Sequence, residues 1–203
     1  MNIAVYCSAK DSIPEDYKCL GDALGTWIAA HGHNLVYGGA TGGLMTRVSE
    51  AFLKEAQRVE AENPFQARPR LIGVVPQRIF DSDRRAEHCD ELIVVSDMAE
   101  RKRTMRERAD LFVCMPGSYG TLDEMFDAIA SATVCEHHKP ILVLNYQGFY
   151  EGLRQQIKQM RALDFLPKDE RDKPHFRQTV EEVEESIMYW TQKQQNRLNK
   201  TNN

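Results

Sequence analysis

Two glycine-rich segments contain the residue types that hold phosphate. Residues 115–121 read Met-Pro-Gly-Ser-Tyr-Gly-Thr and stand between an apolar run and an amphipathic stretch, which predicts a loop leading from a strand into a helix. Small residues let backbone N–H groups approach an anion, and a helix start adds unpaired donors and about half a positive charge. Phosphate is the expected ligand of this loop. Residues 38–43 lack the spacing of a dinucleotide fingerprint and the ending of a P-loop, so a purely structural turn is an equal alternative there.

Charged and hydroxyl side chains accompany the second loop. Glu124 is expected in the first turn of the following helix, where a carboxylate ordinarily stabilises the helix dipole. A bound phosphate would repel it there, which favours a chemical role. Arg101 belongs to a basic segment that is typical of a solvated helix face, yet its place after a strand end allows contact with phosphate or carboxylate. The hydroxyl of Thr121 caps the helix or binds the phosphate, and Ser118 leaves the same two alternatives.

Strands and helices alternate along the chain. Helices are expected over about 17–32, 44–59, 98–109, 121–136, 149–160 and 180–190, and strands over 1–7, 34–37, 71–75, 92–95, 111–115 and 141–144. The last four strands lack alternation, which is typical of strands covered on both faces of a parallel sheet. In the helix from Thr121, the residues expected to face the sheet are Leu122, Met125, Phe126 and Ile129.

This pattern predicts the α/β class: a single-domain, Rossmann-like, doubly wound parallel sheet with helices on both faces. We expect one nucleotide-binding domain over residues 1–195, followed by a polar tail, 196–203. Ligands of such folds bind outside the carboxyl ends of the strands, where both glycine loops are expected.

The composition limits the classes of partner and ligand that this chain is expected to bind. The 26 Lys and Arg residues against 30 Asp and Glu give a net charge of −4, which argues against nucleic acid as the partner. The apolar runs are too short for a membrane span, and the first residues do not resemble a signal peptide. Five cysteines without a C-x-x-C pair indicate neither disulfides nor zinc, so we expect a cytoplasmic protein with Cys7 and Cys114 as core residues. No metal site and no cofactor is expected.

These motifs resemble those of the Lonely Guy (LOG) family of nucleotide phosphoribohydrolases, whose members are often labelled lysine decarboxylases. Pro116 to Glu124 is similar to the family's P-G-G-x-G-T-x-x-E, and the segment from Met98 to Lys102 is similar to its M-x-x-R-K. The glycine run from Gly39 to Met45 is similar to the family's G-G-x-x-G-L-M, and the resemblance covers roughly residues 1–160. Ser118 stands where the family's motif has its second glycine, and residues 131–133 read Ser-Ala-Thr where many members have W-A-Q.

The resemblance implies a hydrolase that cleaves the N-glycosidic bond of nucleoside 5′-monophosphates, either AMP or a cytokinin riboside 5′-monophosphate, to free base and ribose 5-phosphate. It implies Arg101 and Glu124 as catalytic residues, with Glu124 acting as a base or as a charge stabiliser. The implied substrate-binding residues are Ser8, Gly39, Gly42, Gly43, Met98, Lys102, Gly117, Ser118, Tyr119, Gly120 and Thr121. His137 and His138 are candidates for the proton donor to the leaving base, with an ordinary surface role as the alternative.

The resemblance also implies a homodimer in which the helix from Thr121 takes part. A second functional hypothesis is a carrier of a nucleotide or phosphorylated cofactor that shares the fold but performs no chemistry. A pyridoxal-phosphate decarboxylase is not supported, because nothing in the sequence singles out a Schiff-base lysine.

Overall fold

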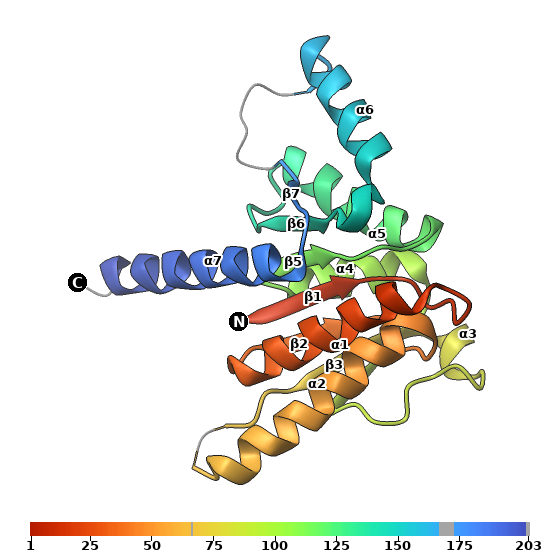
Figure 1. The fold of residues 1–203 in the computed structure, drawn as a ribbon, viewed down its shortest axis with the longest axis vertical. Helices are drawn as coiled ribbons and strands as arrows, with labels where there is room; N and C mark the ends of the chain where they lie inside the picture. The colour runs from red at the N-terminus through yellow and green to blue at the C-terminus, as the bar shows by residue number, and fades with distance from the viewer. Residues whose placement is uncertain (66, 167–172, 202–203) are drawn as a thin grey trace.

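Seven parallel strands form the central sheet of the computed structural model, which describes residues 1–65, 67–166 and 173–201 (Figure 1). Their order across the sheet is β4-β3-β2-β1-β5-β6-β7. Every neighbouring pair of strands in this sheet is parallel. The strands are β1 (Asn2–Tyr6), β2 (Asn34–Tyr37), β3 (Leu71–Pro76), β4 (Glu91–Val95), β5 (Leu111–Cys114), β6 (Ile141–Leu144) and β7 (His175–Arg177).

Helices cover both faces of this sheet. One apolar core joins the sheet to α1 (Glu15–Ala30), α2 (Gly43–Glu62) and α7 (Val180–Thr201). A second core, on the other face, joins it to α4 (Met98–Arg108) and α5 (Tyr119–Thr133). The remaining helices are α3 (Gln77–Phe80), a 3₁₀ turn (Tyr146–Gly148) and α6 (Glu151–Ala162), which extends away from the sheet (Figure 1). The predicted doubly wound α/β fold is confirmed.

The strand order reverses at the centre of the sheet. The chain lays down β1 to β4 toward one edge and then returns to place β5 on the other side of β1, with Tyr6 beside Cys114. The connections that leave β1 and β5 therefore diverge at their carboxyl ends, and such a switch point is where open α/β sheets bind ligands. The Ser8 amide donates to the Pro116 carbonyl at 3.3 Å across this point.

Several local expectations are corrected. The strand β4 is the edge of the sheet and is only partly covered, with Val94 39% exposed, because an apolar run does not reveal whether a neighbour lies beside it. The helix α5 begins at Tyr119, two residues before Thr121, and Phe126 on it is exposed instead of facing the sheet. The short strand β7 is not predicted, because its sequence contains no apolar run. The helix α7 continues to Thr201, through most of the segment 196–203 that is predicted to be a polar tail.

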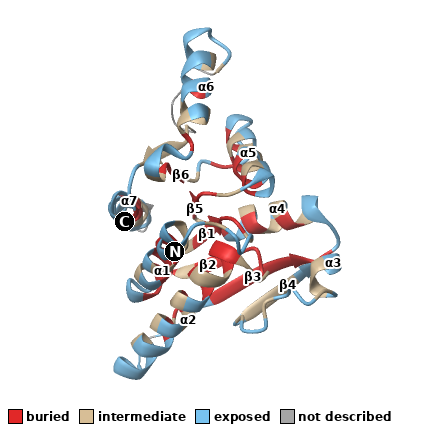
Figure 2. Ribbon diagram, turned by 45° about the vertical axis from the view of Figure 1, so that its right-hand side comes forward, coloured by how far each residue is buried: buried red, intermediate tan, exposed pale blue. Residues whose placement is uncertain are grey.

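The buried residues gather in the central strands and in the two apolar cores between the sheet and the helices on its two faces (Figure 2). Cys7 and Cys114 are buried free thiols, as expected of core residues. Among the described residues, none of the helices combines the length and the apolar character that a membrane crossing requires.

Candidate active site

A buried ion pair lies beneath the carboxyl edge of the sheet. Arg101 on α4 is 5% exposed and Glu124 on α5 is 3% exposed, and Nη1 of the arginine donates to Oε1 of the glutamate. Nε of Arg101 donates to the carbonyl of Val74 at 2.9 Å. A methyl group on Gly38 would collide with Nη2 of the same guanidinium. The sheet and the first glycine loop thus fix the plane of the arginine, and the arginine fixes the carboxylate.

Burial controls the protonation of this pair. Desolvation raises the pKa of Glu124, while the charge and the hydrogen bond of Arg101 act in the opposite direction. Burial also raises the pKa of Tyr6 on β1, and the nearby charge of Glu124 raises it further. The site therefore holds a carboxylate in a poorly hydrated setting, where its charge acts strongly on whatever binds beside it.

The start of α5 offers unpaired backbone donors next to this carboxylate. Ser118 occupies the N-cap position, and within the described chain its side chain makes no capping hydrogen bond. The first turn contains no acidic residue: the prediction that Glu124 lies there is wrong, because α5 begins at Tyr119, before Thr121. A methyl group on Gly120 would meet nothing within 4 Å, so the chain itself leaves open space in front of this turn. These features fit an anion that approaches the α5 amides.

Thr121 lies inside this turn and does not cap it. Its side chain is buried, and a methyl group on Gly117 would collide with its hydroxyl. The glycine is therefore required so that the loop can pass close to the threonine. Of the two alternatives left open for Thr121, the N-cap is excluded, because Ser118 holds that position.

The starts of α1, α2 and α4 at this edge already carry or contact acidic groups. The Gly43 amide at the start of α2 donates to Oδ1 of Asp11 at 2.8 Å, and the Gly42 amide donates to the Thr46 hydroxyl at 2.6 Å. The first turn of α4 is capped by Asp97, and the first turn of α1 contains two acidic residues. Gly39, with φ at +62°, packs against β3. These contacts favour the turn-forming interpretation of residues 38–43, because the Gly42 and Gly43 amides are already engaged within the chain.

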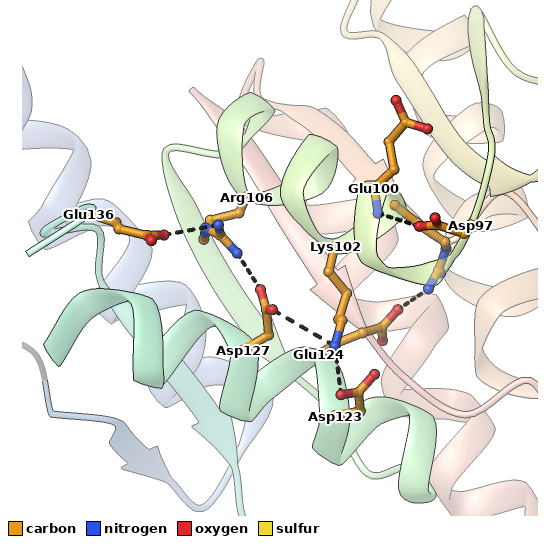
Figure 3. A network of polar contacts seen from close by, with 9 residues as sticks. Asp97, Glu100, Lys102, Arg106, Asp123, Glu124, Asp127 and Glu136 are labelled. Carbon is orange, nitrogen blue, oxygen red and sulfur yellow. Dashed lines mark hydrogen bonds and ion pairs between the residues drawn. The ribbon is translucent and has the colours of Figure 1, made fainter. Parts of the chain in front are cut away.

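An ion-pair ladder aligns the two helices that carry the catalytic candidates (Figure 3). Lys102 on α4 contacts Asp123 at 2.7 Å and Asp127 at 3.8 Å, both on α5. Arg106 also pairs with Asp127, and with Glu136 at 3.0 Å. The ammonium of Lys102, expected to bind substrate, is thus engaged in holding α4 beside α5.

The remaining predicted residues line the edges of the site. Ser8 is buried after β1, and its hydroxyl accepts from the Lys10 amide at 3.2 Å. Met98, at the start of α4, is 44% exposed, and the ring of Tyr119 is 90% exposed. For Tyr119 the contribution to the site is its backbone position in the first turn of α5.

Neither histidine candidate lies at the site. His137 is buried at the far end of α5, where Nε2 lies 3.0 Å from the Ala128 carbonyl and Nδ1 accepts from the Lys139 amide at 3.2 Å. His138 lines a separate cavity of about 220 Å³ with Trp190 and Lys193. The sequence reasoning missed Gly38 and the Val74 carbonyl. Only the glycine run itself could have pointed to Gly38, since close approach of a side chain leaves no other signal.

Comparison with known proteins identifies the family to which this chain is similar. A family model described as "Possible lysine decarboxylase" matches residues 45–187. The chain is 31% identical over 189 residues to a probable cytokinin riboside 5′-monophosphate phosphoribohydrolase, LOGL3, of Oryza sativa subsp. japonica, covering 91% of this chain and 84% of that protein. It is 33% identical to the enzyme of that name from Mycobacterium marinum, covering 82% of each. With LOG5 of Arabidopsis thaliana the identity is 34%, over 74% of this chain and only 61% of that protein.

Solved structures share the fold. The Moco carrier protein from Chlamydomonas reinhardtii superposes with a TM-score of 0.66 at 21% identity, covering 95% of this chain and 98% of that one. The molybdenum cofactor binding protein from Rippkaea orientalis gives 0.66 at 19% identity, covering 94% and 96%. At these identities the likeness concerns the fold alone.

Removal of Arg101 is expected to destabilise the protein. The change Arg101→Met leaves the buried Glu124 without its partner and is expected to lower the free energy of unfolding by about 3–5 kcal/mol at pH 7. The double variant Arg101→Met/Glu124→Gln should recover part of the loss, because no buried charge remains. Lys102→Met, which breaks more exposed pairs, should cost about 1 kcal/mol or less. Urea unfolding measures all three, and equal losses for Arg101→Met and Lys102→Met would contradict the expectation.

Proposed function

We propose that this chain, which belongs to the family described as "Possible lysine decarboxylase", is a nucleoside 5′-monophosphate phosphoribohydrolase. It cleaves the N-glycosidic bond of AMP or of a cytokinin riboside 5′-monophosphate and releases the free base and ribose 5-phosphate. The observation that carries the proposal is the buried Glu124, oriented by Arg101 and placed beside the uncapped start of α5. The relatives named above, at 31–34% identity, support it.

The first step is capture of the 5′-phosphate. The amides of the first turn of α5 and the partial positive charge of the helix start bind the phosphate oxygens. Gly117 lets the loop pass close to Thr121, and the open space at Gly120 admits the ligand. The phosphate fixes one end of the substrate, so that the ribose extends toward Glu124.

The second step is loss of the base. Cleavage of the N-glycosidic bond develops positive charge on the ribose, as in an oxocarbenium ion. The Glu124 carboxylate stabilises that charge, and water then completes the substitution at the anomeric carbon. The same carboxylate can take the proton of the attacking water. Either role requires the ionised carboxylate, and both leave the same products.

Arg101 acts through Glu124 in this proposal. Its Nε is committed to the Val74 carbonyl and its Nη1 to the carboxylate. These bonds hold the carboxylate in one orientation and oppose the effect of burial on its pKa. We therefore assign orientation of Glu124 to Arg101 and binding of the phosphate to the α5 start.

The alternative is a carrier that binds a phosphorylated ligand without turnover. Two structural neighbours are proteins that carry or bind the molybdenum cofactor, but at 19–21% identity they bear on the fold alone. A carrier has no need of a buried carboxylate oriented toward the ligand, since a negative charge weakens binding of an anion. The hydrolase therefore accounts for Glu124 and the carrier does not.

Replacement of Glu124 tests the proposed activity. Wild-type protein incubated with AMP is expected to release adenine and ribose 5-phosphate, measured by chromatography. Glu124→Gln, which is nearly isosteric, should lower kcat by about a hundredfold or more, because it removes the charge that the transition state needs. Asp123→Asn is the matched control, since this neighbouring carboxylate is exposed and pairs with Lys102, and its kcat should stay close to wild type. Binding of a panel of monophosphates without turnover would instead identify a carrier.

The dependence of kcat on pH tests the ionisation of Glu124. Its pKa is raised above the ordinary value of 4.5, so the reactive carboxylate is present at high pH and is lost as pH falls through the raised pKa. We expect kcat at saturating AMP to fall on the acid side with a midpoint above 4.5. Binding of ribose 5-phosphate, measured over the same pH range, reports the ionisation of the phosphate, whose pKa is about 6. This measurement distinguishes the ionisation of the ligand from that of Glu124. A kcat that stays constant down to pH 4.5 would contradict this assignment.

We also propose that two copies associate through α5, as the resemblance implies. Tyr119, Phe126 and Val134 are exposed along this helix at spacings of about two turns. Light scattering at micromolar concentration should show a dimer, and Phe126→Asp should shift it to monomer by placing a charge in an apolar contact. Phe65→Asp, at a fully exposed phenylalanine in the loop after α2, is the control and should remain dimeric. A monomeric wild type would refute the proposal.

A further inference from the structure

Tyr150 lies beneath the loop that joins β5 to α5. We propose that it is a positioning residue for the phosphate loop: its hydroxyl fixes the bend at Pro116 and thereby aims the first turn of α5 at the ligand. This inference rests on the proposed function, because it takes the α5 start as the seat of the phosphate. No motif marks Tyr150 in the sequence, since it lies about thirty residues beyond the loop that it supports.

The hydroxyl of Tyr150 contacts the chain on both sides of Pro116. It donates to the Met115 carbonyl at 2.8 Å, and the residue is 4% exposed. The Gly117 backbone interacts with the same oxygen, a contact that lowers the pKa of Tyr150 against the larger raising effect of burial. The phenol oxygen thus holds the carbonyl that precedes the proline, and the Gly117 backbone lies close to it. Proline has no N–H of its own, so this bend gains no support from a Pro116 amide.

Tyr150 is itself held firmly. Its amide donates to Oδ1 of Asn145 at 2.6 Å, and the Asn145 amide donates to the Arg177 carbonyl at 2.7 Å. Asn145 is 1% exposed. The ring also packs edge-on against Phe149, with centroids 4.8 Å apart. The position of the hydroxyl is therefore set by the end of β6 and by β7, elements that do not otherwise take part in the site.

A second contact holds the loop from the opposite direction. The Pro116 carbonyl accepts from the Ser8 amide at 3.3 Å, so the loop is fixed by β1 on one side and by Tyr150 on the other. Loss of the phenol oxygen leaves the buried Met115 carbonyl without its hydrogen bond to Tyr150, and the loop is expected to relax.

The test is Tyr150→Phe, which keeps the ring and removes only the oxygen. We expect KM for AMP to rise about three- to thirtyfold, as loss of a buried hydrogen bond predicts, while kcat stays within about twofold. The inhibition constant of ribose 5-phosphate should weaken by the same factor, and that of adenosine, which lacks the phosphate, should not change. The matched control is Tyr37→Phe, because Tyr37 is also buried and its hydroxyl contacts Cys89 instead of the loop.

The outcomes separate this inference from the proposed function. Unchanged inhibition by ribose 5-phosphate in Tyr150→Phe overturns the inference, as does an equal loss for adenosine, which would indicate general damage to the fold. A kcat that falls while KM stays constant also overturns it. A wild type that binds ribose 5-phosphate by calorimetry without hydrolysing AMP overturns the hydrolase alone, and weaker binding in Tyr150→Phe then still supports the inference. A wild type that binds no ribose 5-phosphate overturns both.

Discussion

The buried ion pair between Arg101 and Glu124 is the constraint on which the rest of the site depends. Removal of two charges from water is costly unless each finds good partners, so both helices must be placed accurately. The helix α4 follows the edge strand β4, yet it packs against the same face as α5, where its guanidinium reaches the end of β3 and the loop at Gly38. The ladder of Lys102 and Arg106 with acids of α5 then keeps the two helices in register.

A second consequence is the distribution of negative charge along this edge of the sheet. The helices α1, α2 and α4 all have carboxylates at or near their first turns, and these groups neutralise the partial charge of the helix starts. The start of α5 has no carboxylate in its first turn, and the nearest carboxylate of the site, Glu124, is turned toward Arg101. In the proposed function, a phosphate would meet the start of α5, and its ribose would come beside a buried acid whose orientation Arg101 fixes.

The sequence predicts the sheet well where strands are buried on both faces, because runs such as Leu111–Cys114 are apolar without interruption. It fails at the edges: β4 is equally apolar but half covered, and β7 consists of His, Phe and Arg. The motifs place Arg101 and Glu124 at the same edge, but their direct contact depends on the crossing of α4 and α5, which no spacing encodes. The requirement for Gly38 and the support from Tyr150 depend on contacts between distant segments, and these too are visible only in three dimensions.

The backbone of the α5 loop explains why serine can stand at position 118, where the family motif has glycine. The first glycine of the motif, Gly117, is demanded by Thr121, whose hydroxyl occupies the place of a side chain there. At the next position the backbone has φ −95° and ψ −160°, an extended conformation that any residue adopts without strain. A serine can therefore replace glycine at the N-cap without altering the course of the loop. Its hydroxyl makes no capping bond within the described chain, so it adds one more donor beside the amides of α5. Ser118 therefore leaves the course of the loop unchanged, and its departure from the family motif does not count against the proposed hydrolysis.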